Sequence, residues 1–362
     1  MSDILDLESI RRVLLDHVEF AFFTDHYIYA GHAVSGHGKR RRISAPNKPM
    51  LALHQRFVKD IREVGFYSPS ATGCKEGSSP YKNVMRHSVS IGKKKKKIFP
   101  RYFYLLDLKS AYENIQIDLL VEALEHFFPQ LKGQNVKKFL LDYCIHPEFE
   151  GLYAGSPSSP DLFNLYCEYV LDRDMRELCE RYGLTYTRYL DDLTFSSSRP
   201  IGIRKRKQIC QLIRQARFDI SPKKAMLRDL DKGPISVNGI GIRKDGSTFL
   251  PRKNAEEISS LLHRANLQLQ HALETYSYLQ FRSMKEFFKE GDPELGGVAS
   301  LVNGKMGLFY STCGRGTKPA STLERKIRER HELFLRLIKE LKDEMKTSSR
   351  QSVLYVYFSS ES

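Results

Sequence analysis

The chain has 362 residues, 41% of them hydrophobic and 28% charged, which is typical of a soluble globular protein of about two domains. No apolar run is long enough to span a bilayer and the N-terminus lacks the basic-then-apolar order of a secretory signal, so we expect a cytoplasmic protein without a membrane partner. The formal net charge of +15 favours nucleic acid as the partner, although lysines and arginines that only solvate the surface would give the same total.

Two clusters of basic residues lie in the first hundred residues, GKRRR at 38–42 and GKKKKK at 92–97. Tyr102, Phe103 and Tyr104 follow the second cluster, and aromatic rings beside cations suit stacking on bases next to phosphate contacts. The same stretch also fits an ordinary buried strand that follows a solvated loop, and we favour this interpretation.

Strand and helix patterns alternate between residues 100 and 250. Runs of β-branched or aromatic residues predict strands at 102–108, 184–190, 193–196 and 235–242. Segments with helical periodicity lie at 119–128, 160–182 and 204–217. This part of the chain is therefore predicted to be α+β.

Beyond Pro251 the pattern becomes helical. Apolar residues recur three and four positions apart from Ile258 to Tyr276, as on one buried helix face, which predicts a separate helical lobe. The apolar run SVLYVYF at 352–358 predicts a short strand at a sheet edge or at a partner contact.

A last long helix is predicted between these two segments. Ser321 and Glu324 form a capping box at its start. One face is apolar, and the other carries cations that either follow a nucleic-acid backbone or simply meet water: Arg325, Arg328, Arg336 and Lys339. We favour the solvated face, because charged residues usually mark the exposed side of a helix.

Cysteine and histidine patterns that bind metals are missing from the sequence. The six cysteines contain no CxxC pair, so they indicate neither a zinc site nor a disulfide framework and are expected to be buried thiols. His32, His37 and His87 have no Cys or His partner at metal spacing and are expected in loops or in the core. The glycine-containing loops at 31–38 and 73–79 do not match the phosphate-binding pattern G-x-x-x-x-G-K-[ST].

The stretch TRYLDDLTFSSS at 187–198 places Asp191 and Asp192 between two predicted strands. Neighbouring side chains on a strand point to opposite faces, so both carboxylates reach one site only if they lie in the turn of a β-hairpin. Adjacent carboxylates repel each other, and a divalent cation such as Mg²⁺ relieves the repulsion. The alternative is an ordinary turn, in which aspartates are common.

A third carboxylate, Asp107, ends the strand predicted at 102–108. If that strand pairs with the hairpin, three carboxylates would hold two metal ions about 3.5–4 Å apart, which activates a 3′-hydroxyl and stabilises departing pyrophosphate. An aspartate that only caps a helix is the alternative. The carboxylates thus predict nucleotidyl transfer with two Mg²⁺ ions, or Mn²⁺ in their place.

Successive motifs resemble those of reverse transcriptases in order and spacing. Palm motifs are matched by DLKSAY (107–112), AGSPSSPDLFN (154–164), YLDD (189–192), SPKKA (221–225) and VNGIGI (237–242). RRISAPNKPMLALHQ (41–55) and ATGCKEGSSPYKNVMRH (71–87) resemble the fingers motifs of the bacterial branch, which includes retron and group II intron enzymes. The resemblance covers about residues 38–245.

The resemblance implies a right-hand polymerase fold of fingers, palm and thumb, with an antiparallel palm sheet and an α-helical thumb. On this basis residues 1–100 form the N-terminal helix and fingers, 101–250 the palm with interleaved fingers elements, 251–346 the thumb and 347–362 a C-terminal tail.

The resemblance also implies the catalytic residues. It assigns metal binding to Asp107, Leu108, Asp191 and Asp192, and catalysis to the three aspartates. Tyr112 resembles the bulky residue that leaves no room for a ribose 2′-hydroxyl, with a core aromatic as the alternative. Lys224 resembles a lysine that protonates departing pyrophosphate, with the adjacent Lys223 or an ordinary surface lysine as alternatives.

Further residues are implied to contact substrate or nucleic acid. Arg42 resembles the fingers arginine that meets the triphosphate, with Arg40 and Arg41 as candidates if the register differs. Ser159, Pro160 and Asp161 resemble a cap and first helical turn beside the nascent pair. The remaining substrate contacts are Gly155, Ser156 and Asn164, and the remaining nucleic-acid contacts are Lys93, Lys94, Lys95 and Gly239, the last in a primer-grip hairpin or only a turn.

Three positions depart from the family pattern. Ala154 replaces the usual Gln of the palm motif, which puts the tightness of substrate selection in doubt. The bacterial pattern NAxxH has Val84 in its second place, between Asn83 and His87, and the retron-like VTG becomes VNG with Asn238 at its centre.

The sequence predicts an RNA-directed DNA polymerase that uses dNTPs to copy a dedicated noncoding RNA into DNA, of the retron or stand-alone antiphage-defence type. No maturase, DNA-binding or HNH endonuclease segment is seen after the predicted thumb, which argues against a mobile group II intron protein. No RNase H segment is seen, so template removal is expected to need a host RNase H, and an effector protein is a further expected partner. Untemplated or protein-primed DNA synthesis and a noncatalytic RNA-binding scaffold are the alternatives.

Overall fold

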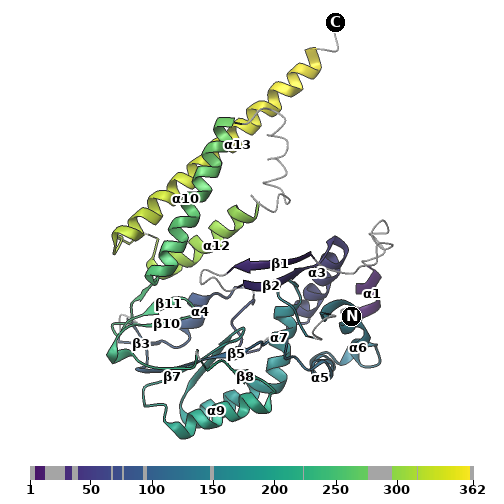
Figure 1. Cartoon of the computed structure of the whole chain (residues 1–362), viewed down its shortest axis with the longest axis vertical. Helices are drawn as coiled ribbons and strands as arrows, with labels where there is room; N and C mark the ends of the chain where they lie inside the picture. The colour runs from purple at the N-terminus through teal and green to yellow at the C-terminus, as the bar shows by residue number, and fades with distance from the viewer. Residues whose placement is uncertain are drawn as a thin grey trace. The chain divides into compact units, whose positions relative to one another are not determined.

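The computed structural model describes residues 5–12, 29–34, 40–66, 68–75, 77–92, 96–146, 151–222, 224–275, 296–315 and 317–358. The chain forms two compact units, shown with their elements in Figure 1. The first comprises Met1–Asn238 and Arg243–Gly246, and the second comprises Gly239–Ile242 and Ser247–Ser362. The chain therefore changes units close to the point where the sequence pattern becomes helical.

An antiparallel sheet lies at the centre of the first unit. Strand β5 (Tyr102–Lys109) pairs with β7 (Asp192–Ser197) on one side, and β7 pairs in turn with β6 (Thr185–Tyr189). On its other side β5 pairs with β8 (Asp219–Ile220) and β9 (Met226–Asp229). Because β5 is central, its side chains are buried on both faces, Phe103 and Tyr104 included, which confirms that these aromatics belong to a core strand.

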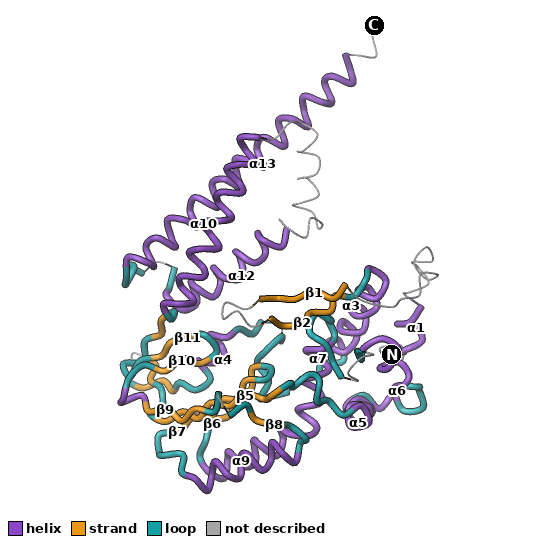
Figure 2. Tube along the Cα trace, viewed as in Figure 1, coloured by secondary structure: helices purple, strands orange, loops and turns teal. Residues whose placement is uncertain are grey.

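Helices pack against this sheet and enclose the core of the first unit. They include α5 (Ile117–Phe127), α7 (Ser159–Cys167), α8 (Arg173–Tyr182) and α9 (Ile203–Gln215), with the short α6 (Val136–Phe139) nearby. Figure 2 shows α9 running along the strands. The α8 helix ends at Gly183, whose φ of 62° is a left-handed conformation that glycine adopts without strain.

The single helix predicted at 160–182 is interrupted. A π-helical turn over Glu168–Asp172 separates α7 from α8. The turn adds a residue to the helical repeat, and its last residue, Asp172, is fully buried. A second π-helical segment, Leu140–Cys144, follows α6.

The N-terminal elements of the first unit are short, apart from one helix. They are α1 (Leu7–Arg12), the antiparallel pair β1 (Tyr29–Val34) and β2 (Arg40–Ala45), α3 (Lys48–Glu63), α4 (Pro80–Met85), and the pair β3 (Val89–Ile91) and β4 (Lys96–Ile98). The Asn47 side chain accepts a hydrogen bond from the Met50 N–H at 3.0 Å and so caps α3. Apolar residues spaced three and four apart, such as Leu53, Phe57 and Ile61, bury one face of α3.

The strand predicted at 235–242 is two strands. Strand β10 (Ile235–Val237) ends at Asn238 and β11 (Ile240–Ile242) begins after Gly239. Both turn residues have positive φ, 48° and 80°, which a continuous strand cannot accommodate.

The second unit is a helical bundle with a small strand pair. Strand β11 pairs with β12 (Thr248–Phe249), and the helices are α10 (Arg252–Thr275), α12 (Gly296–Cys313) and α13 (Thr322–Phe358). Its core is formed by the apolar faces of the helices, among them Ile258, Phe309 and Phe334. The described helices thus confirm the predicted helical lobe.

The last helix begins as predicted and ends later. The Ser321 hydroxyl accepts a hydrogen bond from the Glu324 N–H at 3.1 Å, and the Glu324 carboxylate accepts one from the Ala320 N–H at 2.8 Å, so the capping box is present. The prediction of a strand at 352–358 is wrong, because α13 continues to Phe358. Neither Gly nor Pro interrupts the sequence after Ser321, so the helix continues through the apolar run.

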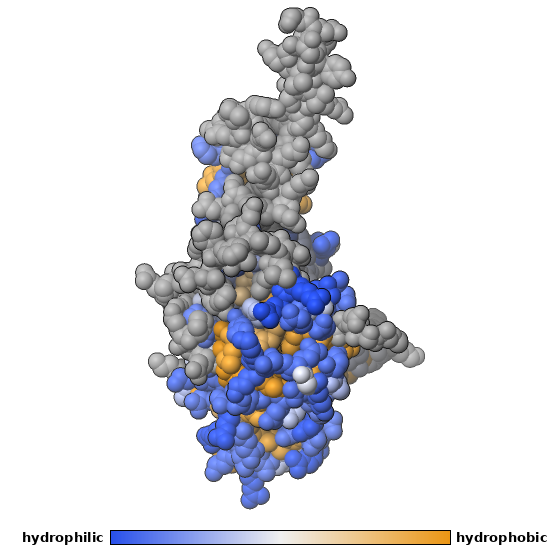
Figure 3. All heavy atoms as spheres, turned by 90° about the vertical axis from the view of Figure 1, so that its right-hand side faces the viewer, coloured by the Kyte–Doolittle hydropathy of each residue, from blue (hydrophilic) through white to orange (hydrophobic). Residues whose placement is uncertain are grey.

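All six cysteines are free, and not all of them are buried. Cys144, Cys167 and Cys179 are buried as expected, whereas Cys74 is exposed because it lies in a loop. None of the described helices is long and apolar enough to cross a membrane. The described surface in Figure 3 is mainly hydrophilic, with apolar residues gathered in small patches.

Candidate active site

The strand pairing brings Asp107 and the 191–192 turn together. Asp107 and Asp192 are partners in the β5–β7 ladder, and the Leu108 N–H donates to the Asp191 carbonyl at 2.9 Å. Tyr189 pairs with Asp192 across the hairpin, so Leu190 and Asp191 form a two-residue turn. The predicted hairpin is therefore present, with carboxylates from two strands at the same end of the sheet.

The negative charge of the three carboxylates exceeds the positive charge beside them. Burial, together with the negative charges of Asp191 and Asp107, raises the pKa of Asp192 to about 6. Two groups act in the opposite direction: the Lys224 ammonium, which pairs with the Asp107 carboxylate, and Asn238, whose side-chain N–H donates to Asp192 Oδ2 at 3.0 Å. The Lys224 side chain is half exposed and Asp107 is buried, so lysine supplies its charge from the solvent side.

Hard oxygen donors make this site chemically suitable for a divalent cation. Among the residues that the structure describes, no three His, Cys, Asp or Glu side chains form a preformed metal cage. Magnesium fits an open arrangement of this kind, because it commonly uses one or two carboxylates and completes its octahedron with water and substrate phosphates. The raised pKa of Asp192 indicates the same need for a cation.

A buried arginine holds the catalytic turn. Arg188 is fully buried, and its guanidinium donates to Asp172 through Nε at 3.0 Å and Nη2 at 2.7 Å. Its Nη1 donates to Asn164 Oδ1 at 3.0 Å and to the Leu190 carbonyl at 3.2 Å. Leu190 has a φ of 54°, so this hydrogen bond supports a residue in a costly left-handed conformation.

The loop at 70–75 extends the sheet beside the turn. The Arg188 N–H donates to the Ser70 carbonyl at 2.9 Å and the Thr72 N–H donates to the Arg188 carbonyl at 2.8 Å. A Cβ atom at Gly73 would lie 2.9 Å from the Leu190 backbone nitrogen. Glycine is therefore required where this loop passes the catalytic turn.

Tyr112 belongs to the same site. Its ring packs edge-on against Phe163 at 5.2 Å between centroids. Burial raises the pKa of the Tyr112 hydroxyl, and the neighbouring Cys74 and Asp191 act in the same direction. Phe163, which contacts Tyr112, also lies 5.2 Å from the Arg188 guanidinium, so Tyr112 is linked to the catalytic turn through one ring.

The loop before α7 contains the predicted substrate contacts Gly155 and Ser156. Gly155 has a φ of 106°, which requires glycine, and the Ala154 carbonyl accepts a hydrogen bond from the Ser44 N–H at 2.9 Å. Ser156 is buried and its hydroxyl contacts the Ser158 hydroxyl at 3.2 Å.

The N-cap of α7 lies one residue earlier than predicted. Ser158 is the cap, and Ser159 is the first helical residue, with a buried hydroxyl that has no hydrogen-bond partner among the described residues. Asp161 is paired with Arg62 through two hydrogen bonds of 3.0 Å. The first turn of α7 is therefore engaged with α3.

Asn164 uses its amide within the protein. Its Nδ2 donates to the Gly73 carbonyl at 3.0 Å, while its Oδ1 accepts from Arg188. Asn164 therefore ties the 70–75 loop to the strand that carries the catalytic turn. Its predicted contact with the substrate stays a prediction.

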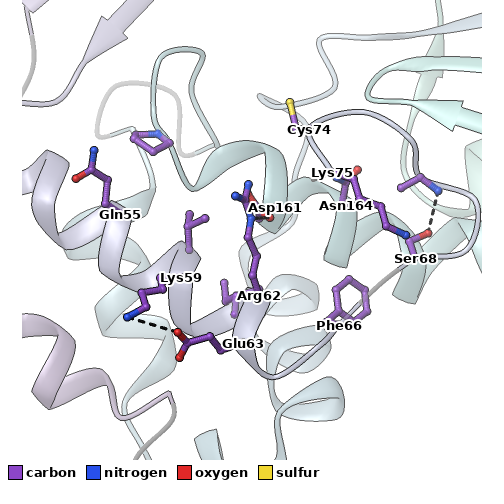
Figure 4. A pocket seen from close by; sticks show the side chains of 14 residues that line it. Gln55, Lys59, Arg62, Glu63, Phe66, Ser68, Cys74, Lys75, Asp161 and Asn164 are labelled. Carbon is purple, nitrogen blue, oxygen red and sulfur yellow. Dashed lines mark hydrogen bonds and ion pairs between the residues drawn. The ribbon is translucent and has the colours of Figure 1, made fainter. Parts of the chain in front are cut away.

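A pocket of about 590 Å³ lies between α3, the 68–75 loop and α7. Figure 4 shows Arg62 extending to Asp161, and Cys74, Ser68 and Asn164 on the opposite side. Lys59 pairs with Glu63 at 3.4 Å, so two of the cations that line the pocket are balanced by carboxylates.

The other predicted contacts belong to further elements or fall outside the described residues. Arg40, Arg41 and Arg42 are in β2, where Arg42 is the ladder partner of His32. Lys93, Lys94 and Lys95, like Lys223 and His37, lie outside the described residues. Gly239 belongs to the second unit, where Asn254 Nδ2 donates to its carbonyl at 3.0 Å.

The histidine predictions are confirmed where the structure describes the side chain. His87 is buried and contacts the Ser196 and Thr187 hydroxyls at 2.7 and 2.8 Å, so it is a core histidine. Burial lowers its pKa to about 3, which keeps the ring neutral. Of the predicted cations of α13, Arg325, Arg336 and Lys339 are exposed, whereas Arg328 donates to the Gly314 and Arg315 carbonyls at 2.7 Å.

Three functional candidates were missed by sequence reasoning. Asn238 contacts Asp192, Arg188 supports the turn, and Asp172 holds Arg188. Asn238 stood out in the sequence only as a departure from the VTG pattern. Arg188 and Asp172 gave no signal, because a charged residue within a strand or a helix usually faces solvent.

Comparison with known proteins identifies the family. Residues 33–242, more than half of the chain, match the family described as reverse transcriptase (RNA-dependent DNA polymerase). The retron Ec86 reverse transcriptase of Escherichia coli is 24% identical over 272 residues, which cover 73% of this chain and 78% of that protein. The retron Ec83 reverse transcriptase of Escherichia coli is 24% identical over 234 residues, covering 62% and 71% respectively.

Solved structures with detectable similarity include telomerases. Telomerase from Candida albicans, in complex with a fragment of telomeric RNA, aligns with 92% of this chain and 70% of that chain at a TM-score of 0.41 and 10% identity. Apo telomerase from Candida tropicalis aligns with 95% and 64%, at a TM-score of 0.42 and 12% identity.

The family match confirms the resemblance that the sequence motifs indicated. Members of this family generally use divalent metal ions, in agreement with the carboxylates at the end of strands β5 and β7. The chain therefore belongs to the reverse transcriptase family, and it is an RNA-directed DNA polymerase with a right-hand fold, an antiparallel palm sheet and a helical thumb.

Proposed function

We propose that this polymerase copies a dedicated noncoding RNA into DNA, and that Asp107, Asp191 and Asp192 hold two Mg²⁺ ions for the reaction. One observation carries the assignment of the site: Asp107 and Asp192 are ladder partners, and Asp191 lies in the adjoining turn. The raised pKa of Asp192 supports it, because a like-charged cluster of this kind is stabilised by added positive charge.

The two ions, when bound, would favour ionisation of the primer 3′-hydroxyl and stabilise the charge of the departing pyrophosphate. Mn²⁺ fits the same hard oxygen donors. Asp107 and Asp191 act as principal ligands, Asp192 closes the site, and the Leu108 backbone adjoins it. Lys224 balances charge and protonates the leaving group, and its ion pair with Asp107 supports this role.

The other roles concern selection of the nucleotide. Tyr112 excludes a ribose 2′-hydroxyl, and its proximity to Asp191 supports this role. Arg42 meets the triphosphate, and Arg40 and Arg41 bind nucleic acid together with Lys93, Lys94, Lys95 and Gly239. Gly155 allows close approach of the backbone, and its positive φ is consistent with such a loop.

The biological role that we propose is antiphage defence. Support comes from the retron reverse transcriptases to which the chain is similar and from its net charge of +15, which suits an RNA partner. A host RNase H or an effector protein would act on the product. Sequencing the RNA and DNA that co-purify with the chain tests this role: a single RNA species and its DNA copy are expected, and a broad mixture of cellular RNA would contradict it.

The site is tested by Mg²⁺-dependent incorporation of labelled dNTPs on an RNA template. We expect Asp191→Asn and Asp192→Asn each to lower incorporation at least about a hundredfold, because each removes a negative charge that a metal ion requires. The matched control is Asp174→Asn, an exposed aspartate of α8 that pairs with the exposed Arg173, and it should retain activity. Unchanged incorporation by both catalytic variants would refute the assignment.

A further inference from the structure

A chain of side-chain hydrogen bonds leads from the 70–75 loop to Asp192. The Thr72 hydroxyl lies 2.8 Å from Asn83 Oδ1, and Asn83 Nδ2 donates to Asn238 Oδ1. Asn238 Nδ2 then donates to Asp192 Oδ2 at 3.0 Å. Thr72 and Asn83 are buried, so water does not compete freely for these bonds.

We propose that Asn83 and Asn238 are positioning residues, which orient Asp192 for metal binding through this relay. The inference rests on the proposed role of Asp192 as a metal ligand. It adds two residues that act on Asp192 through hydrogen bonds, and it assigns each a defined orientation of its amide.

The charge of Asp192 fixes the direction of every bond in the relay. An ionised carboxylate only accepts hydrogen bonds, so Asn238 must present its NH₂ group to Asp192 and its oxygen to Asn83. Asn83 must then present its own NH₂ group to Asn238 and its oxygen to Thr72. The Thr72 hydroxyl donates to Asn83 in consequence, and a single arrangement satisfies all members.

The backbone at Asn238 explains why an asparagine is present there. Its φ of 48° lies in the left-handed region, which asparagine tolerates and a β-branched residue such as threonine does not. Threonine also lacks the NH₂ group and the reach of an amide. The change from VTG to VNG thus provides both the turn conformation and the donor to Asp192.

The relay leaves the second oxygen of Asp192 available. Because Oδ2 is held by Asn238, the carboxylate cannot rotate freely, and Oδ1 keeps one orientation. Outer residues that orient metal ligands change metal affinity or activity by about 10- to 100-fold when they are replaced. An effect of this size is therefore expected on the Mg²⁺ requirement.

Four single variants separate the relay from simple packing. Asn238→Gly keeps the left-handed backbone and deletes the donor. Asn83→Asp keeps the shape but places an acceptor against Asn238 Oδ1, which drives the Asn238 amide to turn its oxygen toward Asp192. Asn83→Ala removes the amide that donates to Asn238 and adds no new acceptor. Asn266→Ala is the matched control, since Asn266 is a buried asparagine that donates to the Arg330 carbonyl at 2.9 Å within the second unit.

Two measurements are made on each variant. The first is the Mg²⁺ concentration for half-maximal incorporation, with the dNTP KM measured at saturating Mg²⁺. The second is Mn²⁺ binding, by electron paramagnetic resonance of free Mn²⁺, to the full chain with an RNA template, a dideoxy-terminated primer and a dNTP. The second measurement needs no turnover.

We expect Asn238→Gly and Asn83→Asp to raise the Mg²⁺ concentration for half-maximal incorporation and to weaken Mn²⁺ binding, each by about tenfold or more. The dNTP KM should change little. Asn83→Ala should have a smaller effect than Asn83→Asp, and Asn266→Ala should have none on either measurement. The decisive variant is Asn238→Gly, because Asn238 is only partly buried and a packing role predicts little loss of Mn²⁺ binding there, whereas aspartate at the fully buried position 83 also carries the cost of an unpaired charge.

Wild-type Mn²⁺ binding by Asn238→Gly, or a larger effect of Asn83→Ala than of Asn83→Asp, would overturn the relay. Either result leaves the assignment of Asp192 intact if Asp192→Asn is inactive. Full activity of Asp192→Asn would instead refute the proposed metal site itself, so the two failures are distinguishable.

Discussion

Arg188 offers a prediction that links stability to catalysis. Its guanidinium and the Asp172 carboxylate are both fully buried, and Arg188 also donates to Asn164 and to the Leu190 carbonyl in the catalytic turn. Arg188→Ala removes the cation and leaves the Asp172 charge buried with Tyr186 as a remaining hydrogen-bond donor.

The expected magnitude follows from these contacts. Removing one partner of a buried ion pair costs about 3–5 kcal/mol, because the other charge is left uncompensated. That is a large part of the roughly 5–15 kcal/mol by which a domain is usually stable. The double variant Arg188→Met/Asp172→Leu leaves no buried charge, so it should destabilise the unit less than Arg188→Ala does.

Polymerase activity should not follow stability in this series. In the double variant the Leu190 carbonyl still lacks its donor, so we expect activity to remain low while the free energy of unfolding recovers. Urea unfolding at pH 7 and dNTP incorporation on an RNA template measure the two quantities. Arg173→Ala is the control, because its ion pair with Asp174 is exposed and contributes little. A loss below about 1 kcal/mol in Arg188→Ala would refute the reasoning.

Two further predictions concern the site itself. Tyr112→Ala should increase the use of rNTPs relative to dNTPs by about tenfold or more, measured by competitive incorporation, whereas Tyr112→Phe should not, because exclusion depends on the ring and not on the hydroxyl. No gain in Tyr112→Ala would count against the steric role. Asp192 has a pKa raised from its ordinary 3.8 to about 6, so the folded state binds its proton more tightly than the unfolded state and stability falls as pH rises from about 4 to 6. Without divalent ions, Asp192→Asn should therefore be more stable than wild type at pH 7 by about 1–3 kcal/mol in urea unfolding. Equal stability would show that Asp192 is not strained by its neighbours.

Local pattern predicted most elements of the first unit, because strand alternation and helix periodicity are properties of short segments. Residues 102–108 form a central strand, and their nearly continuous burial follows from neighbours on both sides. The hairpin turn at Leu190 and Asp191 was also expected, since two like charges could share a site only from a turn.

The errors have physical causes that local pattern does not reveal. The π-helical turn at Glu168–Asp172 interrupts the predicted helix, and Asp172 in this turn is buried although a charged residue usually faces solvent. The run at 352–358 has no periodicity that separates strand from helix, and the preceding helix continues into it.

The relay and the Arg188 network depend on contacts between distant segments. Asn83 and Asn238 are 155 residues apart and meet only when α4 and the β10 turn pack together. No sequence pattern in a single chain encodes such a pair. The family motifs located the carboxylates, and the side chains that hold them became visible only in the fold.

The central claim is that Asp107, Asp191 and Asp192 converge on divalent metal ions. The most direct measurement is the anomalous X-ray signal of Mn²⁺ in a crystal of the full chain with RNA template, dideoxy-terminated primer and dNTP. The account predicts Mn²⁺ bound by Asp107 and the 191–192 turn, with distances typical of metal–oxygen bonds. Manganese bound elsewhere, with Lys224 still paired to Asp107, would contradict it.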